Sequence, residues 1–294
     1  MAWFVISIAH ADLTNGLVAY YPFNGNADDE SGNGYNGTVS NVLSATDRFG
    51  VPGGAFWYNG TNSFIDLGNP AAFNFAGDFT ISVWIMANTT QIDTYVVGKY
   101  YYQRPHAYGV GSDDVGGMYA FAANTPQPSG GRPEIRATID LADGRWHHLV
   151  AVFERQISLR GYVDGTEIGF DTQITNHIEV LTNEYPLLIG KISSGNSFQG
   201  SIDDVRIYNR ALSAPEVQQL YEFESGPRVI FVKAFTLDYR GLTLGSNYQL
   251  QVSADLNTWT NYGTPFMATG VNYTNTDYQR IQDWGRLFFR LQIQ

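Results

Sequence analysis

Residues 79–85 read Phe79-Thr80-Ile81-Ser82-Val83-Trp84-Ile85, in which apolar residues occupy every second position. Successive side chains of a β-strand point to opposite faces, so the odd-numbered residues would share one face. Four large apolar side chains on one face indicate burial in a protein core. The segment therefore predicts a strand with one face in the core.

A second alternating segment, residues 146–153, follows the turn residues Asp143-Gly144. Because neighbouring side chains of a strand point in opposite directions, His147 and His148 would lie on different faces and cannot bind one metal ion together. We expect Trp146 and both histidines to pack in the core and to form hydrogen bonds between sheets.

Turn and cap signals divide the rest of the larger part of the chain. Asp164-Gly165 between two strand-like runs is a strong signal for a hairpin. Ser213 and Glu216 have the spacing of a capping box and predict a short helix. The remaining strand-like runs are residues 186–190 and 201–208.

Ser225-Gly226-Pro227 interrupts this pattern and predicts a domain boundary. We expect a larger domain over residues 12–225 and a small β module over residues 228–294, preceded by an apolar segment, residues 1–11. That segment ends in Ala9-His10-Ala11, which has the small-x-small form of a signal-peptidase site. It is either a signal-peptide remnant or a strand donated to a neighbouring subunit.

The chain carries 28 acidic and 17 basic residues, a net charge of −11. Binding to nucleic-acid phosphates needs clustered Lys and Arg, so this charge argues against a nucleic-acid partner. The charge permits cation binding, but its main expected role is solubility. Cysteine is absent, which excludes disulfides and thiolate metal sites without excluding export. No other segment approaches the length of a membrane-spanning helix.

Four segments, in their order and spacing, resemble the bacterial laminin-G-like jelly-roll family of the concanavalin A-like lectin/glucanase superfamily. They are residues 16–34, 79–84, 146–153 with the turn 162–165, and 200–213. The resemblance covers about residues 12–224. It implies an all-β fold in which two antiparallel sheets form a jelly-roll sandwich and the first and last strands lie side by side. Residues 228–294 resemble the small immunoglobulin-like modules that end bacterial surface proteins.

The family also implies a structural calcium ion, which we assign to Asp29, Asn33, Asp203 and Asp204. Asp203 alternates in phase with Val205 and Ile207, so its carboxylate is expected on the core side, where it needs a partner. Adjacent first and last strands would let the Asp29 loop meet Asp203. The alternative is that Asp29 and Asn33 only make turn hydrogen bonds, while Asp203 accepts backbone N–H groups.

Residues 100–133 are rich in Gly, Pro and Tyr and predict long loops between short strands. Loops on a rigid sandwich often carry specificity. Sugar binding needs exposed aromatic rings beside a few polar groups; the candidates are Tyr100, Tyr101, Tyr102, Arg104, His106 and Tyr108. At least one of the three consecutive tyrosines is expected to be exposed. Contact with another protein surface and plain packing remain the alternatives.

Nothing in the sequence supports catalysis. Glucanases of this fold carry a glutamate-x-aspartate-x-glutamate strand motif, and the nearest stretch here is Glu222-Phe223-Glu224, which we interpret as surface charge. The sequence thus predicts a secreted, non-catalytic binding or adhesion protein, extracellular or at the cell surface, with a polysaccharide or glycoprotein as partner. The alternative is a structural subunit of an extracellular filament or surface layer, assembled through residues 1–11 and exposed strand edges.

Overall fold

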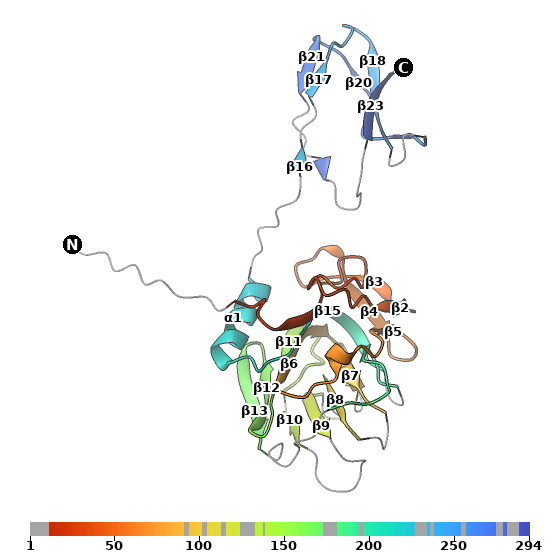
Figure 1. Ribbon diagram of the computed structural model, residues 1–294. Coiled ribbons are helices and arrows are strands. Elements are labelled where there is room, and N and C mark those ends of the chain that lie inside the picture. The colour runs from red at the N-terminus through yellow and green to blue at the C-terminus, as the bar shows by residue number, and fades with distance from the viewer. Residues whose placement is uncertain are drawn as a thin grey trace, which may run out of the picture. The chain divides into compact units, whose positions relative to one another are not determined.

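Two antiparallel sheets packed face to face form the larger part of the chain (Figure 1). This computed structural model describes residues 12–90, 94–101, 105–112, 116–123, 133–137, 139–172, 181–193, 197–226, 234–235, 238–253, 257–274, 279–280 and 288–294. The chain divides into two compact units, residues 1–227 and 228–294. The predicted signal or donor segment, residues 1–11, lies outside the described residues.

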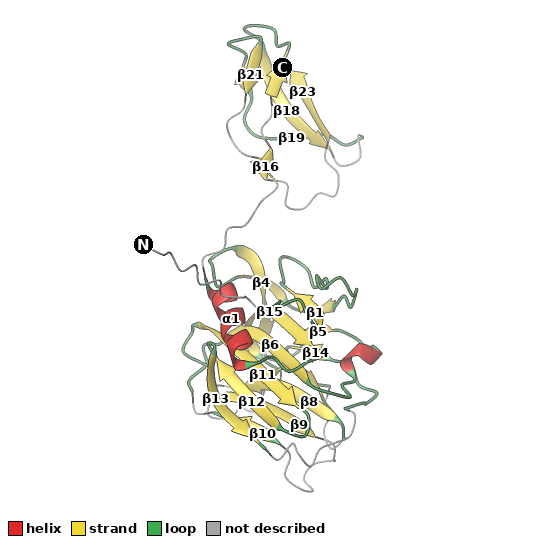
Figure 2. Ribbon diagram, turned by 60° about the vertical axis from the view of Figure 1, so that its left-hand side comes forward, coloured by secondary structure: helices red, strands yellow, loops and turns green. Residues whose placement is uncertain are grey.

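The first sheet has eight strands in the order β13-β12-β11-β6-β15-β4-β3, with β1 also paired to β15 (Figure 2). Its strands are β1 (Leu17–Tyr21), β3 (Leu43–Thr46), β4 (Pro52–Asn59), β6 (Phe79–Met86), β11 (Trp146–Glu154), β12 (Ser158–Val163), β13 (Thr166–Asp171) and β15 (Gln199–Tyr208). The pairing of β1 with β15 confirms that the first and last strands lie side by side.

The second sheet has seven strands in the order β10-β9-β8-β7-β14-β5-β2. They are β2 (Thr38–Ser40), β5 (Phe64–Asp66), β7 (Thr94–Lys99), β8 (Ala107–Ser112), β9 (Met118–Ala123), β10 (Glu134–Arg136) and β14 (Leu188–Ile189), with a short 3-10 helix at Ala71–Phe73. Within the predicted region 100–133, β8 and β9 are six-residue strands that are buried along their whole length. The expectation of short strands here is confirmed, and residues 102–104, 113–115 and 124–132 lie outside the described residues.

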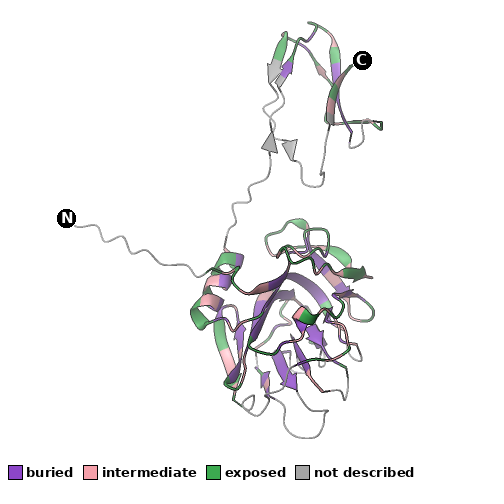
Figure 3. Cartoon of the chain, viewed as in Figure 1, coloured by how far each residue is buried: buried purple, intermediate pink, exposed green. Residues whose placement is uncertain are grey.

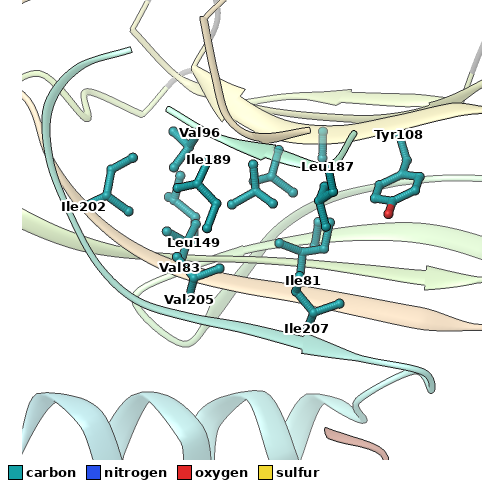
Figure 4. Packing of buried hydrophobic residues seen from close by; sticks show 14 of the residues in the cluster. Ile81, Val83, Val96, Tyr108, Leu149, Leu187, Ile189, Ile202, Val205 and Ile207 are labelled. Atoms are coloured by element: carbon teal, nitrogen blue, oxygen red, sulfur yellow. The ribbon is translucent and has the colours of Figure 1, made fainter. Parts of the chain in front are cut away.

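Side chains from both sheets interdigitate between the layers (Figure 4). The odd-numbered residues of β6 all belong to this core, which confirms the predicted alternation. Phe79 lies at its centre, because its ring stacks on Phe75 at 4.2 Å and on Phe153 at 4.0 Å. The prediction of an all-β, two-sheet sandwich is thus confirmed.

The hairpin and the helix also form where the sequence predicts them. Asp164 and Gly165 both have positive φ, 50° and 78°, as a two-residue hairpin turn requires. Helix α1 (Ala214–Ser225) begins at Ser213 with the complete capping box to Glu216.

Helix α1 covers the outer face of the eight-stranded sheet. Its Val217 and Leu220 pack in one buried cluster with outward-facing residues of the sheet and with the segment that leads into the helix; the others are Val150, Val152, Tyr162, Tyr208 and Leu212. Both faces of the central strands are therefore buried, and Figure 3 shows buried residues along these strands and exposed ones at the edges of the unit. An outer face closed in this way can hold polar groups only when they have partners.

The smaller unit is built from short strands. They are β16 (Ala234–Phe235), β17 (Asp238–Arg240), β18 (Asn247–Ser253), β19 (Thr260–Asn261), β20 (Phe266–Met267), β21 (Asn272–Thr274), β22 (Gln279–Arg280) and β23 (Phe288–Ile293). The central strand β18 pairs with β19, β20 and β23. Its core includes Tyr239, Leu242, Tyr248, Leu250 and Ala268. The likeness of this unit to immunoglobulin-like modules stays a prediction.

No helix within the described ranges is long and apolar enough to cross a membrane.

The aromatic stack predicts a large effect of one substitution. Phe153→Ala should lower the free energy of unfolding of the larger unit by about 3–5 kcal/mol, because it leaves a cavity beside Phe79. Phe170→Ala is the matched control: Phe170 is 63% exposed, and its loss should cost at most about 0.5 kcal/mol. Urea unfolding of the two variants measures the difference, and equal losses would contradict this account of the core.

Candidate functional site

The first two residues predicted to bind metal hold the loop that follows β1. The Asp29 carboxylate accepts the backbone N–H groups of Tyr20, Ser31 and Tyr35 over 2.9–3.0 Å. Partial burial acts to raise the pKa of Asp29, but these hydrogen bonds outweigh it and hold the pKa below 3.8. The side-chain amide of Asn33 donates to the carbonyls of Leu17 and Val18.

The other two predicted metal ligands lie on β15, where the strand contains a bulge. Asp203 pairs with Trp84 and Arg206 with Ser82, so β15 has one more residue than β6 between these pairs. Asp204 takes up the extra residue with φ of 44°. The bulge shifts the alternation and turns Asp203 to the outer face, under helix α1. The expectation that Asp203 points to the core with Val205 and Ile207 is therefore wrong.

Five charged side chains meet on this outer face and form what we call the buried ionic cluster: Arg48, Asp203, Asp204, Arg206 and Glu224. Arg48 lies 2.6 Å from the Asp203 carboxylate and 2.5 Å from that of Asp204. Arg206 lies 2.6 Å from Glu224, a residue of α1. Glu224 is fully buried, so its interpretation as surface charge is wrong. The sequence gives the charge of Glu224, but only the packing of α1 on the sheet shows that it is buried.

Neutral partners complete the cluster. Trp84 donates its indole N–H to Glu224 over 2.7 Å, and Tyr20 donates its hydroxyl to Asp204 over 2.5 Å. His148 shares a hydrogen bond of 2.7 Å with Ser82 and lies on the opposite face of β11 from the core residues Leu149, Ala151 and Phe153. The ring of Tyr221, from α1, stacks near the rings of Trp84 and His148.

Burial sets the protonation of these groups. Burial and then the adjacent Asp204 carboxylate raise the pKa of Asp203 to about 8. Burial also raises the pKa of Glu224, whereas it lowers the pKa of His148 to about 3. Three carboxyl groups face two guanidinium groups in the cluster, while His148 stays neutral beside them.

The structure brings Asp29 and Asp204 to opposite ends of one residue, since the Tyr20 backbone N–H binds Asp29 and the Tyr20 hydroxyl binds Asp204. Their oxygens are matched by protein donors, and Asp203 and Asp204 face a guanidinium group. Within the described ranges, no three His, Asp or Glu residues form a group that could hold a metal ion. The contacts of these four residues argue against one calcium site, and calcium binding by the chain stays a prediction.

The predicted ligand-binding residues separate into buried and exposed members. Tyr108 is fully buried and donates its hydroxyl to the carbonyl of Phe73. Tyr100 is buried in an aromatic cluster on the outer face of the seven-stranded sheet. Neither can offer a ring face to a ligand, so these two assignments are corrected. Tyr102 and Arg104 lie outside the described residues.

Tyr101 is the exposed tyrosine that the sequence predicts. It is 37% exposed and its ring stacks on Tyr185, with centroids 4.6 Å apart and planes 16° from parallel. His106, half-buried, lies a few residues along the same segment with φ of 60°. Tyr185 is half-buried, so the stacked pair lies at the surface of the unit.

Amide groups hold this end of the sandwich together. Asn183 donates its side-chain N–H to the carbonyl of His106 over 2.8 Å. The ammonium group of Lys99 donates to Asn74 and to both the side chain and the carbonyl of Asn183, each at 2.9 Å. Because Lys99 is buried among neutral acceptors, burial lowers its pKa to about 8. Two hydrogen bonds from Lys99, at the end of β7, and one to His106 thus hold the segment that carries Tyr185.

A family model described as the concanavalin A-like lectin/glucanases superfamily matches residues 59–218, more than half of the 294 residues. No curated protein sequence matches the chain significantly.

Solved structures share the fold. The binding domain of Paraclostridial Mosquitocidal Protein 1 aligns with a TM-score of 0.61 and 17% identity, over 96% of this chain and 76% of that chain. Domain 4 of an extracellular arabinanase from Geobacillus stearothermophilus, in complex with arabinotriose, aligns with a TM-score of 0.55 and 21% identity, over 70% and 98%. The binding domain of botulinum neurotoxin DC, in complex with rat synaptotagmin II, gives 0.55 and 14%, over 96% and 72%.

The ion pair between Arg206 and Glu224 predicts a large loss of stability when its charge is removed. Glu224→Gln should lower the free energy of unfolding by about 3–5 kcal/mol, because Arg206 then stays buried without a counter-ion. Glu222→Gln, two residues away and exposed, is the control and should cost at most about 0.5 kcal/mol. Equal stability of both variants in urea unfolding would show that Glu224 carries no charge in the fold.

His147 predicts that the fold loses stability as the pH rises, the opposite of the effect of a buried neutral histidine. Its protonated ring donates hydrogen bonds to Asp164 (2.8 Å) and Asp143 (3.2 Å), and the bond to Asp164 is the largest cause that raises the His147 pKa above 6.5. The protonated ring therefore stabilises the fold fully below pH 6.5, and this contribution is lost as the pH rises through the folded pKa.

Urea unfolding between pH 5 and 9 measures the free energy of unfolding of the wild type and of His147→Gln. The wild type should be the more stable at low pH, and its advantage should shrink as the pH rises. A difference that is constant with pH would rule out the charged pair.

Proposed function

Because the chain belongs to the concanavalin A-like lectin/glucanases superfamily, we propose that it is a secreted, non-catalytic binding protein whose ligand is a polysaccharide or the glycan of a glycoprotein. The observation that carries the proposal is the stack of the exposed Tyr101 on Tyr185. A flat aromatic face packs against the C–H face of a sugar ring, while amide and hydroxyl groups nearby accept and donate hydrogen bonds.

The stacked pair of Tyr101 and Tyr185, called the aromatic platform below, is held rigidly, which supports a role in ligand binding. The Tyr185 ring backs that of Tyr101, and Lys99 and Asn183 fix the loop that carries Tyr185. A ring held in place before binding loses little conformational freedom when a ligand docks. The net charge of −11 makes a neutral glycan a better ligand than a strongly anionic one.

The comparisons support a binding role of this kind. Two of the similar structures are described as binding domains, and the arabinanase domain is described in complex with a trisaccharide. The carboxyl groups of Asp203 and Asp204 on β15 and of Glu224 on α1 are buried between the helix and the sheet, where they face arginines. A glycoside hydrolase needs two carboxyl groups that face one cleft.

Export is the second part of the proposal. It is supported by the small-x-small sequence at Ala9-His10-Ala11 and by the description of the similar arabinanase as extracellular. Fractionation of cells that express the chain from its native gene should place the protein in the medium or at the cell surface. Recovery in the cytoplasm alone would contradict this part while leaving ligand binding open.

Substitution of the platform tests ligand binding. The wild type should bind members of a glycan array that includes arabinotriose and neutral polysaccharides, and Tyr101→Ala should weaken that binding about tenfold or more, the loss expected for an anchoring aromatic side chain. Phe170→Ala, which removes another exposed ring from the same unit, should bind like the wild type. Calorimetric titration measures the affinities.

An array on which the wild type binds nothing would overturn the proposal. Equal binding by Tyr101→Ala and the wild type would place the ligand elsewhere on the unit.

A further inference from the structure

Arg48 supplies the positive charge that faces Asp203 and Asp204. Its Nη1 donates to Asp203 over 2.6 Å, its Nη2 to Asp204 over 2.5 Å, and its Nε to the backbone carbonyl of Glu224 over 2.9 Å. All three nitrogens of the guanidinium group thus have an oxygen acceptor, and the side chain is 4% exposed. The acceptors match the planar fork of an arginine.

Aromatic rings complete the surroundings of this group. The guanidinium carbon lies 4.5 Å from the centroid of the Phe49 ring and 4.6 Å from that of Trp84, within the range of a cation–π interaction. A metal ion that binds oxygen ligands is not stabilised when aromatic rings occupy the positions of those ligands. A weakly hydrated guanidinium group, by contrast, packs well against aromatic rings. The aromatic rings and the oxygen acceptors around Arg48 therefore both favour a guanidinium group.

The loop between β3 and β4 delivers Arg48 to this position. The Asp47 carboxylate accepts the backbone N–H groups of Phe49 and Val51, each over 2.8 Å, and Gly50 closes the turn with φ of 80°. Arg48 is thus carried on a short, internally bonded hairpin loop. A cation tethered in this way is present at every calcium concentration and loses no translational freedom on binding.

A calcium ion would need different surroundings. It takes six to eight oxygen ligands in a shell around the ion. Here the acceptors of two carboxylates and one carbonyl point at three nitrogens of one planar group. The pocket therefore disagrees with the calcium ion that the family resemblance implies at Asp203 and Asp204.

We propose that the space between Asp203, Asp204 and the C-terminal end of α1 is a guanidinium-specific pocket, which Arg48 fills in place of a calcium ion. The pocket joins four segments that are distant in sequence: the loop at residues 47–51, β6 through Trp84, β15, and α1 through the Glu224 carbonyl. The larger unit is then stabilised by its own side chain and does not depend on calcium.

Differential scanning calorimetry of the full chain tests both parts of the proposal. The Tm of the wild type should be the same in excess EDTA and in millimolar calcium chloride. Arg48→Ala should lower the Tm of the larger unit by roughly 10 °C, because two buried carboxylates lose their partner. Arg145→Ala is the matched control, since the side chain of Arg145 is 82% exposed.

Chemical rescue identifies the group that the pocket prefers. Millimolar methylguanidinium chloride should raise the Tm of Arg48→Ala while leaving the wild type and Arg145→Ala unchanged, and methylammonium chloride at the same concentration should not. Arg48→Lys keeps the charge without the fork and should remain destabilised relative to the wild type.

Two results would overturn the proposal. One is a wild-type Tm that falls in EDTA and recovers with calcium, which would assign the stabilising charge to a metal ion. The other is an Arg48→Ala variant as stable as Arg145→Ala. If Arg48→Ala does not fold, the Arg48→Lys variant and the metal titration of the wild type still decide the question.

Discussion

The larger unit depends on how it neutralises charge between the eight-stranded sheet and helix α1. The outer face of this sheet carries two aspartates and an arginine on β15, and α1 adds a glutamate directly above them. Charged groups removed from water are tolerated only when each has a partner of good geometry. The bulge at Asp204, the loop that carries Arg48 and the position of Glu224 all satisfy that single requirement.

This requirement distinguishes the buried ionic cluster from the region around Tyr101. The ionic cluster uses strong, closely matched pairs and closes itself off from solvent. The region around Tyr101 is held instead by neutral amides: Lys99 donates to Asn183 and Asn74, and burial lowers its pKa.

Alternation and turn chemistry were enough to predict much of the sandwich. Residues 79–85 lie in a strand with the expected buried face, Asp164-Gly165 forms the hairpin turn, and Ser213 caps the helix. These signals are local, because each depends on the geometry of a few consecutive residues. The short strands β8 and β9 contain glycines that normally weaken strands, whereas here Gly109 leaves room for the rings of Tyr95 and Phe121.

The positions of the site residues could not be predicted from local sequence patterns. A single inserted residue at Asp204 reverses the face of Asp203, and nothing in a run of alternating residues marks a bulge in advance. Arg48 is distant from its partners by more than 150 positions, so only the pairing of β3, β4 and β15 brings it near them. Glu224 looks like any charged residue at a helix end until Trp84 and Arg206 are placed beneath it. A pocket made by long-range register can therefore hold a different cation from the one that its acidic residues suggest.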